Sequence, residues 1–182
     1  MKTIQKISGG MALGFSLVLF LTSCKDDLSD GSARVRLTDA PALYSEVNVE
    51  ILSVSVHYED EHLGNKGWVT LESNAGVYNL LKLQNDVTVV LSDDQSLPLG
   101  KVTQIRLMLG DDNSVISSGV SYELKVPSGY ESGVKIGLNT DLKFNKTIDI
   151  ILDFDADKSV IMEGNGSFTL KPVIKVESIV EL

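Results

Sequence analysis

The sequence predicts an all-β protein, a single antiparallel β-sandwich of the immunoglobulin or prealbumin type with about nine strands. Two observations predict this class. Short segments in which apolar and polar residues alternate recur along the chain and are separated by Gly, Pro, Asn and Asp. No segment shows a convincing amphipathic helical pattern of about ten residues or more. A closed barrel is the alternative arrangement of such strands.

Length and composition allow one folded domain preceded by a leader. The chain has 182 residues, and 43% of them are hydrophobic, which is enough for a packed core. We expect a signal peptide over residues 1–23, a lipidated anchor and flexible linker over 24–32, and the sandwich over 33–182.

The leader has the features of a secretory signal. Lys2 and Lys6 precede an apolar run over residues 11–21, which is shorter than the roughly 20 residues that span a bilayer. Residues 21–24, Leu-Thr-Ser-Cys, resemble the bacterial lipobox, in which cleavage precedes the cysteine and lipid is attached to its thiol. The resemblance implies two or three acyl chains on Cys24, and anchoring needs more than one. An ordinary signal peptide with a chance cysteine is the alternative.

The residues after the cysteine suggest a location. Lys-Asp-Asp at 25–27 resembles the acidic signal that sends some lipoproteins to the outer face of the outer membrane. A solvated acidic tether is the alternative. We therefore expect an outer-membrane lipoprotein of the cell envelope that is exposed at the cell surface.

Charge and cysteine usage exclude several classes of protein. The formal net charge is -9, or -9 - 2 = -11 without the two leader lysines, so nucleic-acid binding is disfavoured. Cys24 is the single cysteine and cannot form an internal disulfide. The two histidines stand alone, which excludes zinc sites of the usual Cys/His kind.

Alternating segments place the expected strands along the chain. The longest, residues 46–58, changes phase between Ile51 and Leu52, which predicts a β-bulge or a strand that changes sheets. Pro172 in the last long strand predicts an edge position or a bulge. The expected strands cover residues 34–38, 46–58, 68–71, 87–91, 103–109, 121–126, 134–138, 148–154 and 167–176, with a strand or helical turn at 77–83, turns at 93–94 and 97–100, and a loop at 139–146.

The strand over residues 148–154 has two unlike faces. Its even-numbered residues are apolar and lie on one face, which can enter the core. Aspartates dominate the other face and must reach solvent, a cation or buried donors. The apolar set is Ile148, Ile150, Leu152 and Phe154, and the acidic set is Asp149, Asp153 and Asp155.

Four short motifs carry a family resemblance. They are Arg-Leu-Thr-Asp-Ala-Pro at 36–41, Gln-Ile-Arg-Leu at 104–107, Asp-Phe-Asp-Ala-Asp-Lys-Ser at 153–159 and Leu-Lys-Pro-Val-Ile at 170–174. In this order, over residues 33–176, the chain resembles domain-of-unknown-function family 4382. Its members are largely secreted or lipid-anchored bacterial proteins. The resemblance implies a single β-sandwich in the envelope and no enzymatic activity, because none is assigned to the family.

Clustered carboxylates suggest calcium as a possible cofactor. Asp153, Asp155 and Asp157 lie at i, i+2 and i+4 and share one side if the strand continues, and Asp39 or the turn at 111–113 could add oxygens. The alternative is that these acids cap a turn and pair with basic side chains, the candidates being Arg34, Arg106 and Lys158.

Other functions leave weaker traces. Trp68 and Tyr130 are the aromatic residues most expected to be exposed, and they could form a glycan platform. Residues 176–182 could donate a strand to an assembly or simply complete the sheet. We find no nucleophile elbow, metalloprotease motif or phosphate loop, so we expect no enzyme.

Together these observations predict a lipid-anchored cell-envelope module that binds an unknown protein or glycan partner or has a structural role. The alternatives are a calcium- or glycan-binding surface lipoprotein and an adhesin or fimbrial-type assembly subunit.

Overall fold

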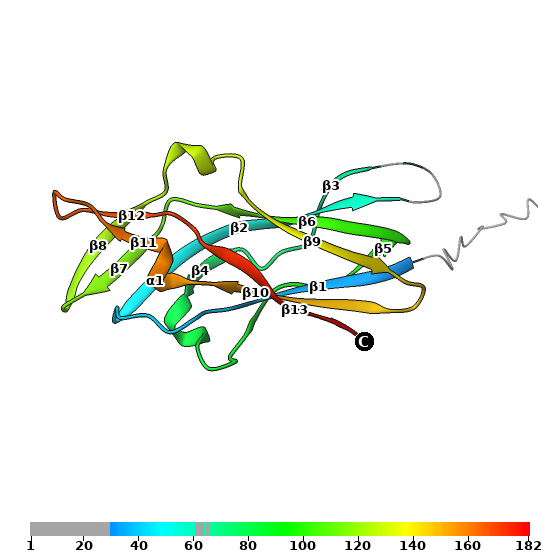
Figure 1. Ribbon diagram of the computed structural model, residues 1–182, viewed down its shortest axis with the longest axis horizontal. Helices are drawn as coiled ribbons and strands as arrows, with labels where there is room; N and C mark the ends of the chain where they lie inside the picture. The colour runs from blue at the N-terminus through cyan, green and yellow to red at the C-terminus, as the bar shows by residue number, and fades with distance from the viewer. Residues whose placement is uncertain (1–29, 61–63, 65) are drawn as a thin grey trace, which may run out of the picture.

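The protein is an all-β sandwich of two sheets (Figure 1). The computed structural model describes residues 30–60, 64 and 66–182. Within these residues, thirteen strands form a four-stranded sheet in the order β13-β10-β1-β5 and a nine-stranded sheet that runs β11-β12-β8-β7-β2-β6-β9, with β3 and β4 also paired to β2. The predicted sandwich is therefore confirmed, although it contains more strands than expected.

The strands of the smaller sheet come from distant parts of the chain. They are β1 (Asp30–Thr38), β5 (Val89–Pro98), β10 (Thr147–Phe154) and β13 (Ile174–Glu181). The strands of the larger sheet are β2 (Glu46–Glu59), β3 (Lys66–Thr70), β4 (Gly76–Asn79), β6 (Gly100–Leu109), β7 (Ser114–Ser117), β8 (Val120–Lys125), β9 (Val134–Leu142), β11 (Val160–Met162) and β12 (Phe168–Leu170). Three short helical segments complete the fold: η1 (Leu80–Leu83), η2 (Ser128–Tyr130) and α1 (Ala156–Ser159).

Both sheets mix parallel with antiparallel pairs, whereas the sequence predicted antiparallel sheets. β1 runs parallel to β10, with Ser32 opposite Thr147 and Thr38 opposite Asp153. In the larger sheet β12 runs parallel to β8. Alternation along a strand reports which residues face the core, but it does not report the direction of the neighbouring strand.

The core lies between the sheets and uses the predicted faces of the strands. Ile148, Ile150, Leu152 and Phe154 of β10 are all buried. They belong to one hydrophobic cluster that also takes residues from the larger sheet, such as Val54 of β2 and Ile105 of β6. Burial of these side chains is the main force that holds the two sheets together.

The predicted change of phase in the long second strand is a register shift. The pairing of β2 with β6 slips between Ile51 and Ser53, which lets Leu52 face solvent while Ile51 and Val54 remain in the core. Leu52 is therefore an extra residue in β2, as expected for a β-bulge.

Two predictions of local structure were wrong, and a third segment, for which a strand and a helical turn were both expected, contains both. Asp93 and Asp94 do not turn the chain; they lie within β5, where Asp94 accepts a hydrogen bond of 2.7 Å from the Arg34 guanidinium. The expected loop over 139–146 begins as the end of β9, because Leu142 is buried. The stretch at 77–83 is both a strand and a helical turn, β4 followed by η1.

The predicted strand over residues 167–176 is two strands in different sheets. β12 ends at Leu170, and β13 begins at Ile174 and pairs with β10 in the other sheet. Between them, the Lys171 amide donates to the Ser159 carbonyl and the Val173 amide donates to the Ser159 hydroxyl. Pro172 therefore marks the crossing between sheets, and the C-terminal segment pairs within its own chain.

No helix in the described part of the chain is long and apolar enough to cross a membrane.

Candidate functional site

Two aspartates on the outer face of β10, Asp149 and Asp153, are buried, and each meets a cation. Asp149 accepts two hydrogen bonds from Arg36 of β1, of 2.9 Å from Nε and 2.5 Å from Nη2. Asp153 pairs with Lys175 of β13 at 3.2 Å. Because β1 and β13 flank β10, their basic side chains lie over the carboxylates of the strand between them.

The chain turns directly after β10. Asp155 caps α1 by accepting a hydrogen bond of 3.0 Å from the Lys158 amide, and its other oxygen lies 2.5 Å from Lys158 Nζ. Burial tends to raise the pKa of Asp155, but the hydrogen bonds from Lys158 outweigh it, so that pKa lies below its ordinary value. The alternative reading of the acidic motif, that an aspartate caps a turn and pairs with Lys158, is correct at this position.

A second aspartate joins this turn to the end of β1. Oδ1 of Asp39 accepts a hydrogen bond of 2.9 Å from the Ala156 amide. The Ser159 hydroxyl donates to the Asp155 carbonyl at 2.5 Å and accepts from the Val173 amide at 2.9 Å. The motifs at 36–41, 153–159 and 170–174 therefore meet at one place, although more than a hundred residues separate the first from the others.

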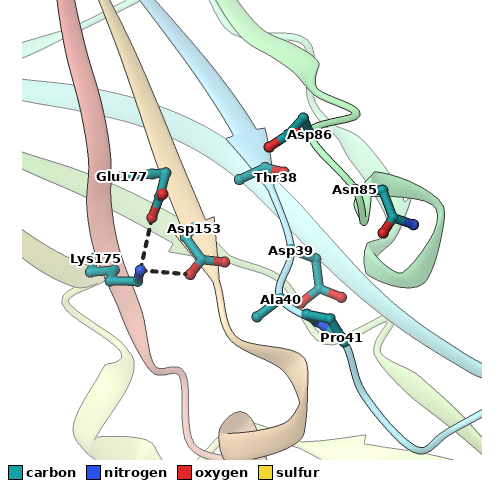
Figure 2. A pocket seen from close by; sticks show the side chains of 9 residues that line it. All are labelled: Thr38, Asp39, Ala40, Pro41, Asn85, Asp86, Asp153, Lys175 and Glu177. Atoms are coloured by element: carbon teal, nitrogen blue, oxygen red, sulfur yellow. Dashed lines mark hydrogen bonds and ion pairs between the residues drawn. The ribbon is translucent and has the colours of Figure 1, made fainter.

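A cavity of about 310 Å³ opens beside this junction, and we call it the β1 pocket. It lies at the C-terminal end of β1, between the chain that leaves β1, the segment after η1, and strands β10 and β13 (Figure 2). It is lined by Thr38, Asp39, Ala40, Pro41, Asn85, Asp86, Asp153, Lys175 and Glu177.

The β1 pocket is acidic. Four carboxylates line it and Lys175 is the single cation, so the formal charge of the lining is 1 - 4 = -3. Lys175 Nζ already contacts Asp153 at 3.2 Å and Glu177 at 2.8 Å, as Figure 2 shows. These pairs raise the pKa of Lys175, so the lysine stays charged.

Asp39 holds its negative charge weakly. Only 4% of the residue is exposed, and this burial raises its pKa from 3.8 to about 6. The nearby charges of Asp153 and Asp155 raise it further, while hydrogen bonds from Ala156 and Gln84 oppose the shift. Asp39 therefore changes charge near neutral pH, which an ordinary aspartate does not.

Asp153 has an oxygen without a partner. The residue is 6% exposed, and its Oδ2 pairs with Lys175, but its buried Oδ1 accepts no hydrogen bond from the residues that the structure describes. In Figure 2 the carboxylate stands between Lys175 on one side and Asp39 on the other. A buried carboxylate oxygen without a donor is costly, and a water or an ion that supplies the missing contact is one explanation for such a group in a native protein.

The segment after η1, which forms one side of the β1 pocket, has an unusual backbone conformation. Asn85 and Asp86 are consecutive non-glycine residues with positive φ, 58° and 65°. Asn and Asp tolerate this region better than other residues, but two in succession still cost energy. The Thr38 hydroxyl lies at 2.8 Å from the Leu83 carbonyl and 3.0 Å from the Val87 carbonyl, and these contacts fix the segment against β1.

The proposed calcium ligands do not converge as the sequence suggested. Asp39, Asp153 and Asp155 are close enough for the last two to raise the pKa of the first. Asp157, however, lies in α1 and is exposed, because the strand ends at Phe154 and does not carry the alternation onward. Within residues 30–60, 64 and 66–182, no group of three or more His, Cys, Asp or Glu side chains is placed to hold a metal ion.

The proposed glycan residues lie away from the β1 pocket. Trp68 is on β3, half-buried, with the Arg106 guanidinium 4.4 Å from the centre of its ring. Tyr130 ends η2 and is half-buried against the core. Lys135 links their surroundings, since it approaches Trp68 and lines a separate cavity with Tyr130. Cys24 lies outside the residues that the structure describes.

The sequence analysis identified Asp39 and Asp153 as candidate site residues, but it did not identify Asn85, Asp86, Lys175 or Glu177, which line the same pocket. Lys175 and Glu177 were hidden because the last strand was expected to end at Val176 without changing sheets. Asn85-Asp86 is a pair that favours left-handed turns, and that signal was available between the predicted segments 77–83 and 87–91.

Comparison with known proteins agrees with the motifs. The family described as "Domain of unknown function (DUF4382)" matches residues 30–172. This range includes β1, β10, α1 and every residue that lines the β1 pocket except Lys175 and Glu177. No curated protein and no solved structure matches the chain.

Proposed function

Because the chain belongs to the DUF4382 family, whose function is unknown, its role rests on the site, and we propose a lipid-anchored, non-catalytic binding module of the cell envelope. Its ligand is a molecule or partner that carries an ammonium group, and the β1 pocket receives that group. The observation that carries the proposal is the buried Oδ1 of Asp153, which has no donor among the described residues and lies in a cavity of net negative charge.

The chemistry of the pocket favours a cation that can also donate hydrogen bonds. An ammonium group supplies both the positive charge that balances the lining and an N–H for Oδ1 of Asp153. A neutral sugar would supply the hydrogen bond but not the charge. A metal ion needs several converging ligands, and one oxygen of Asp153 is already paired with Lys175.

The proposed anchor would place this pocket away from the membrane. Asp30, the first residue of β1, is the sixth residue after Cys24, so a fully extended chain spans at most about 20 Å between them. The pocket lies at the other end of β1, nine residues or about 30 Å further along the strand. A lipid on Cys24 would thus hold the start of β1 near the bilayer and leave the pocket open to solvent or a partner.

The amine ligand can be tested with a small probe. The probe is N-acetyl-lysine methylamide, which carries one ammonium group, and N-acetyl-norleucine methylamide is its neutral match. We expect the lysine probe alone to shift the backbone NMR signals of Thr38, Asp86 and Asp153, with a dissociation constant of about 1 mM, typical of a single charged group. Affinity should rise between pH 5 and pH 7 as Asp39 ionises.

A matched pair of variants locates the interaction. Asp153→Asn removes the charge at the pocket and should weaken binding about tenfold, whereas Asp157→Asn removes an equal charge from an exposed position and should not. Calcium and maltotriose are added to the same samples as competitors. If neither lysine nor norleucine probe shifts the pocket signals, or if only calcium or maltotriose does, the ammonium ligand is wrong.

A further inference from the structure

The outer face of the larger sheet carries a second cluster, which we call the Trp68 patch. It consists of His57 on β2, Trp68 on β3, Gln104 and Arg106 on β6, and Lys135 on β9. Arg106 alternates with Ile105 and Leu107, which are buried in the core, so its side chain lies on the opposite face of β6. The patch therefore faces away from the smaller sheet and from the β1 pocket.

Strand register fixes the members of the patch in two neighbouring rows. Trp68 lies opposite His57, which lies opposite Gln104, which lies opposite Gly137. In the next row, Arg106 lies opposite Ser55 on one side and Lys135 on the other, and Ser55 lies opposite Thr70. These two rows contain two permanent cations and no carboxylate, in a chain with 25 acidic residues.

The two cations converge on one aromatic ring. The Arg106 guanidinium carbon lies 4.4 Å and the Lys135 amine 6.0 Å from the centre of the Trp68 ring. His57 contacts the same ring edge to face, at 5.3 Å between centroids. Cation–π contact fixes a guanidinium by its flat face, which leaves the N–H groups along its edge free to donate.

Neither cation is neutralised within the described part of the chain. Arg34, Arg36, Lys101, Lys158 and Lys175 each form an ion pair, but Arg106 and Lys135 form none with the described carboxylates. Glu59 lies beside the patch, with its Oε1 4.0 Å from His57 Nδ1. Nε of Arg106 is buried and has no hydrogen-bond acceptor.

We propose that the Trp68 patch binds the carboxylate of an acidic sugar. The guanidinium of Arg106 receives the carboxylate through its edge, Lys135 adds a second positive charge, and Trp68 holds Arg106 in place. Two polar side chains in the same rows, Thr70 and Gln104, are at least partly exposed and supply donors and acceptors for sugar hydroxyls. Gly137 has no atom within 4 Å of where a side chain would begin, so that end of the row has room for a ring.

Net charge limits the kind of anion that fits. A chain with a formal charge of -9 repels a nucleic acid, whose phosphates are closely spaced, and two cations cannot offset that repulsion. A planar carboxylate on an otherwise neutral ring needs only the two charges present. This site and the β1 pocket take ligands of opposite charge and share no residue, so the two proposals stand independently.

Titration with an alginate trisaccharide, which carries one carboxylate per sugar, tests the proposal. We expect Trp68 fluorescence to change and the backbone NMR signals of Arg106, Lys135 and Gly137 to shift in the unaltered protein. Maltotriose of the same length and no charge should give neither response. Raising the salt concentration should weaken binding, since the patch is at the surface.

Variants then assign the interaction to the patch. Arg106→Gln should weaken alginate binding about tenfold. Arg106→Lys should bind more tightly than Arg106→Gln but less tightly than the wild type, because an ammonium group cannot form the paired hydrogen bonds that a guanidinium forms with a carboxylate. Lys125→Gln is the control, since it removes an equal charge from the exposed end of β8. Asp153→Asn should bind alginate as the wild type does, which separates this site from the β1 pocket.

Four results would overturn the inference. They are no response to alginate, equal binding by Arg106→Gln and wild type, a stronger response to maltotriose, and a response restricted to a sulfated disaccharide or to single-stranded DNA. A thermal melt of each variant confirms folding, and the fluorescence and NMR responses of the wild type stand even where a variant fails to fold.

Discussion

Asp39 accepts a hydrogen bond from the backbone of Ala156, a residue 117 positions further along the chain. The bond joins the end of β1 to the start of α1 and closes the inner side of the β1 pocket. One carboxylate thus fastens the fold and shapes the candidate site. The two roles can be separated by mutation. Accepting the hydrogen bond from Ala156 needs only an oxygen atom at this position, whereas attracting a cation into the pocket needs the negative charge.

The first prediction concerns this fastening. Asp39→Ala leaves the buried Ala156 amide without an acceptor, so unfolding should become easier by about 1 to 3 kcal/mol. Asp39→Asn keeps an oxygen at this position and should equal or exceed the wild type at pH 8, because it removes repulsion from Asp153 and Asp155. Urea denaturation measures both. Asp157→Ala, at an exposed position, is the control and should change stability by less than about 0.5 kcal/mol.

The second prediction concerns pH. The pKa of Asp39 is about 6 in the folded protein and 3.8 at its ordinary value, so the folded state binds the proton more tightly. This contribution stabilises the fold below about pH 4 and is lost as the pH rises through about 6. The loss corresponds to about 3 kcal/mol by linkage. It should appear as the difference between wild type and Asp39→Asn in urea titrations from pH 4 to pH 8; a constant difference would contradict it.

The third prediction concerns the pair between β1 and β10. Arg36→Gln leaves the buried Asp149 carboxylate without its two charged donors and should cost about 3 to 5 kcal/mol. The double variant Arg36→Met with Asp149→Leu removes both charges and should recover most of that loss. Arg34→Gln, which breaks more exposed pairs with Asp93 and Asp94, serves for comparison and should cost under about 1 kcal/mol. Equal losses for Arg34→Gln and Arg36→Gln would argue against a special role for burial.

The fourth prediction concerns the anchor. Cys24→Ala removes the thiol that would carry lipid, so the protein should leave the membrane fraction of the cell. Mass spectrometry of the wild type should find an acylated cysteine as the first residue. Ser29→Ala, a nearby change that spares the thiol, should leave the protein with the membrane. A wild-type protein that retains residues 1–23 and a free thiol would disprove the anchor.

The parts of the fold that could be predicted are those in which the alternation of apolar and polar residues shows which side chains are buried. The alternation over 148–154 gave the buried face of β10, and the change of phase at Ile51-Leu52 located the slip in register. Strand direction and partners were not predictable, because β1 pairs with β10 across more than a hundred residues and no local pattern encodes that choice.

The site was predictable only in part for the same reason. Asp149 and Asp153 were visible in the sequence, but the cations that meet them, Arg36 and Lys175, arrive from flanking strands. The turn predicted at Asp93-Asp94 was wrong for the same reason. Two consecutive aspartates are typical of a turn, but the contact between Asp94 and Arg34 of the neighbouring strand holds this segment in a sheet. Tertiary pairing overrode local propensity in each case.

The first strand of this domain is an interior strand, with Ser32 contacting Thr147 115 residues later. A chain that emerges from its N-terminus must therefore keep β1 unpaired on one side until nearly the whole domain has been made. Such long-range closure is slow, and it leaves an open strand available to wrong partners in the meantime. We expect the newly made polypeptide to depend on holding factors until β10 arrives.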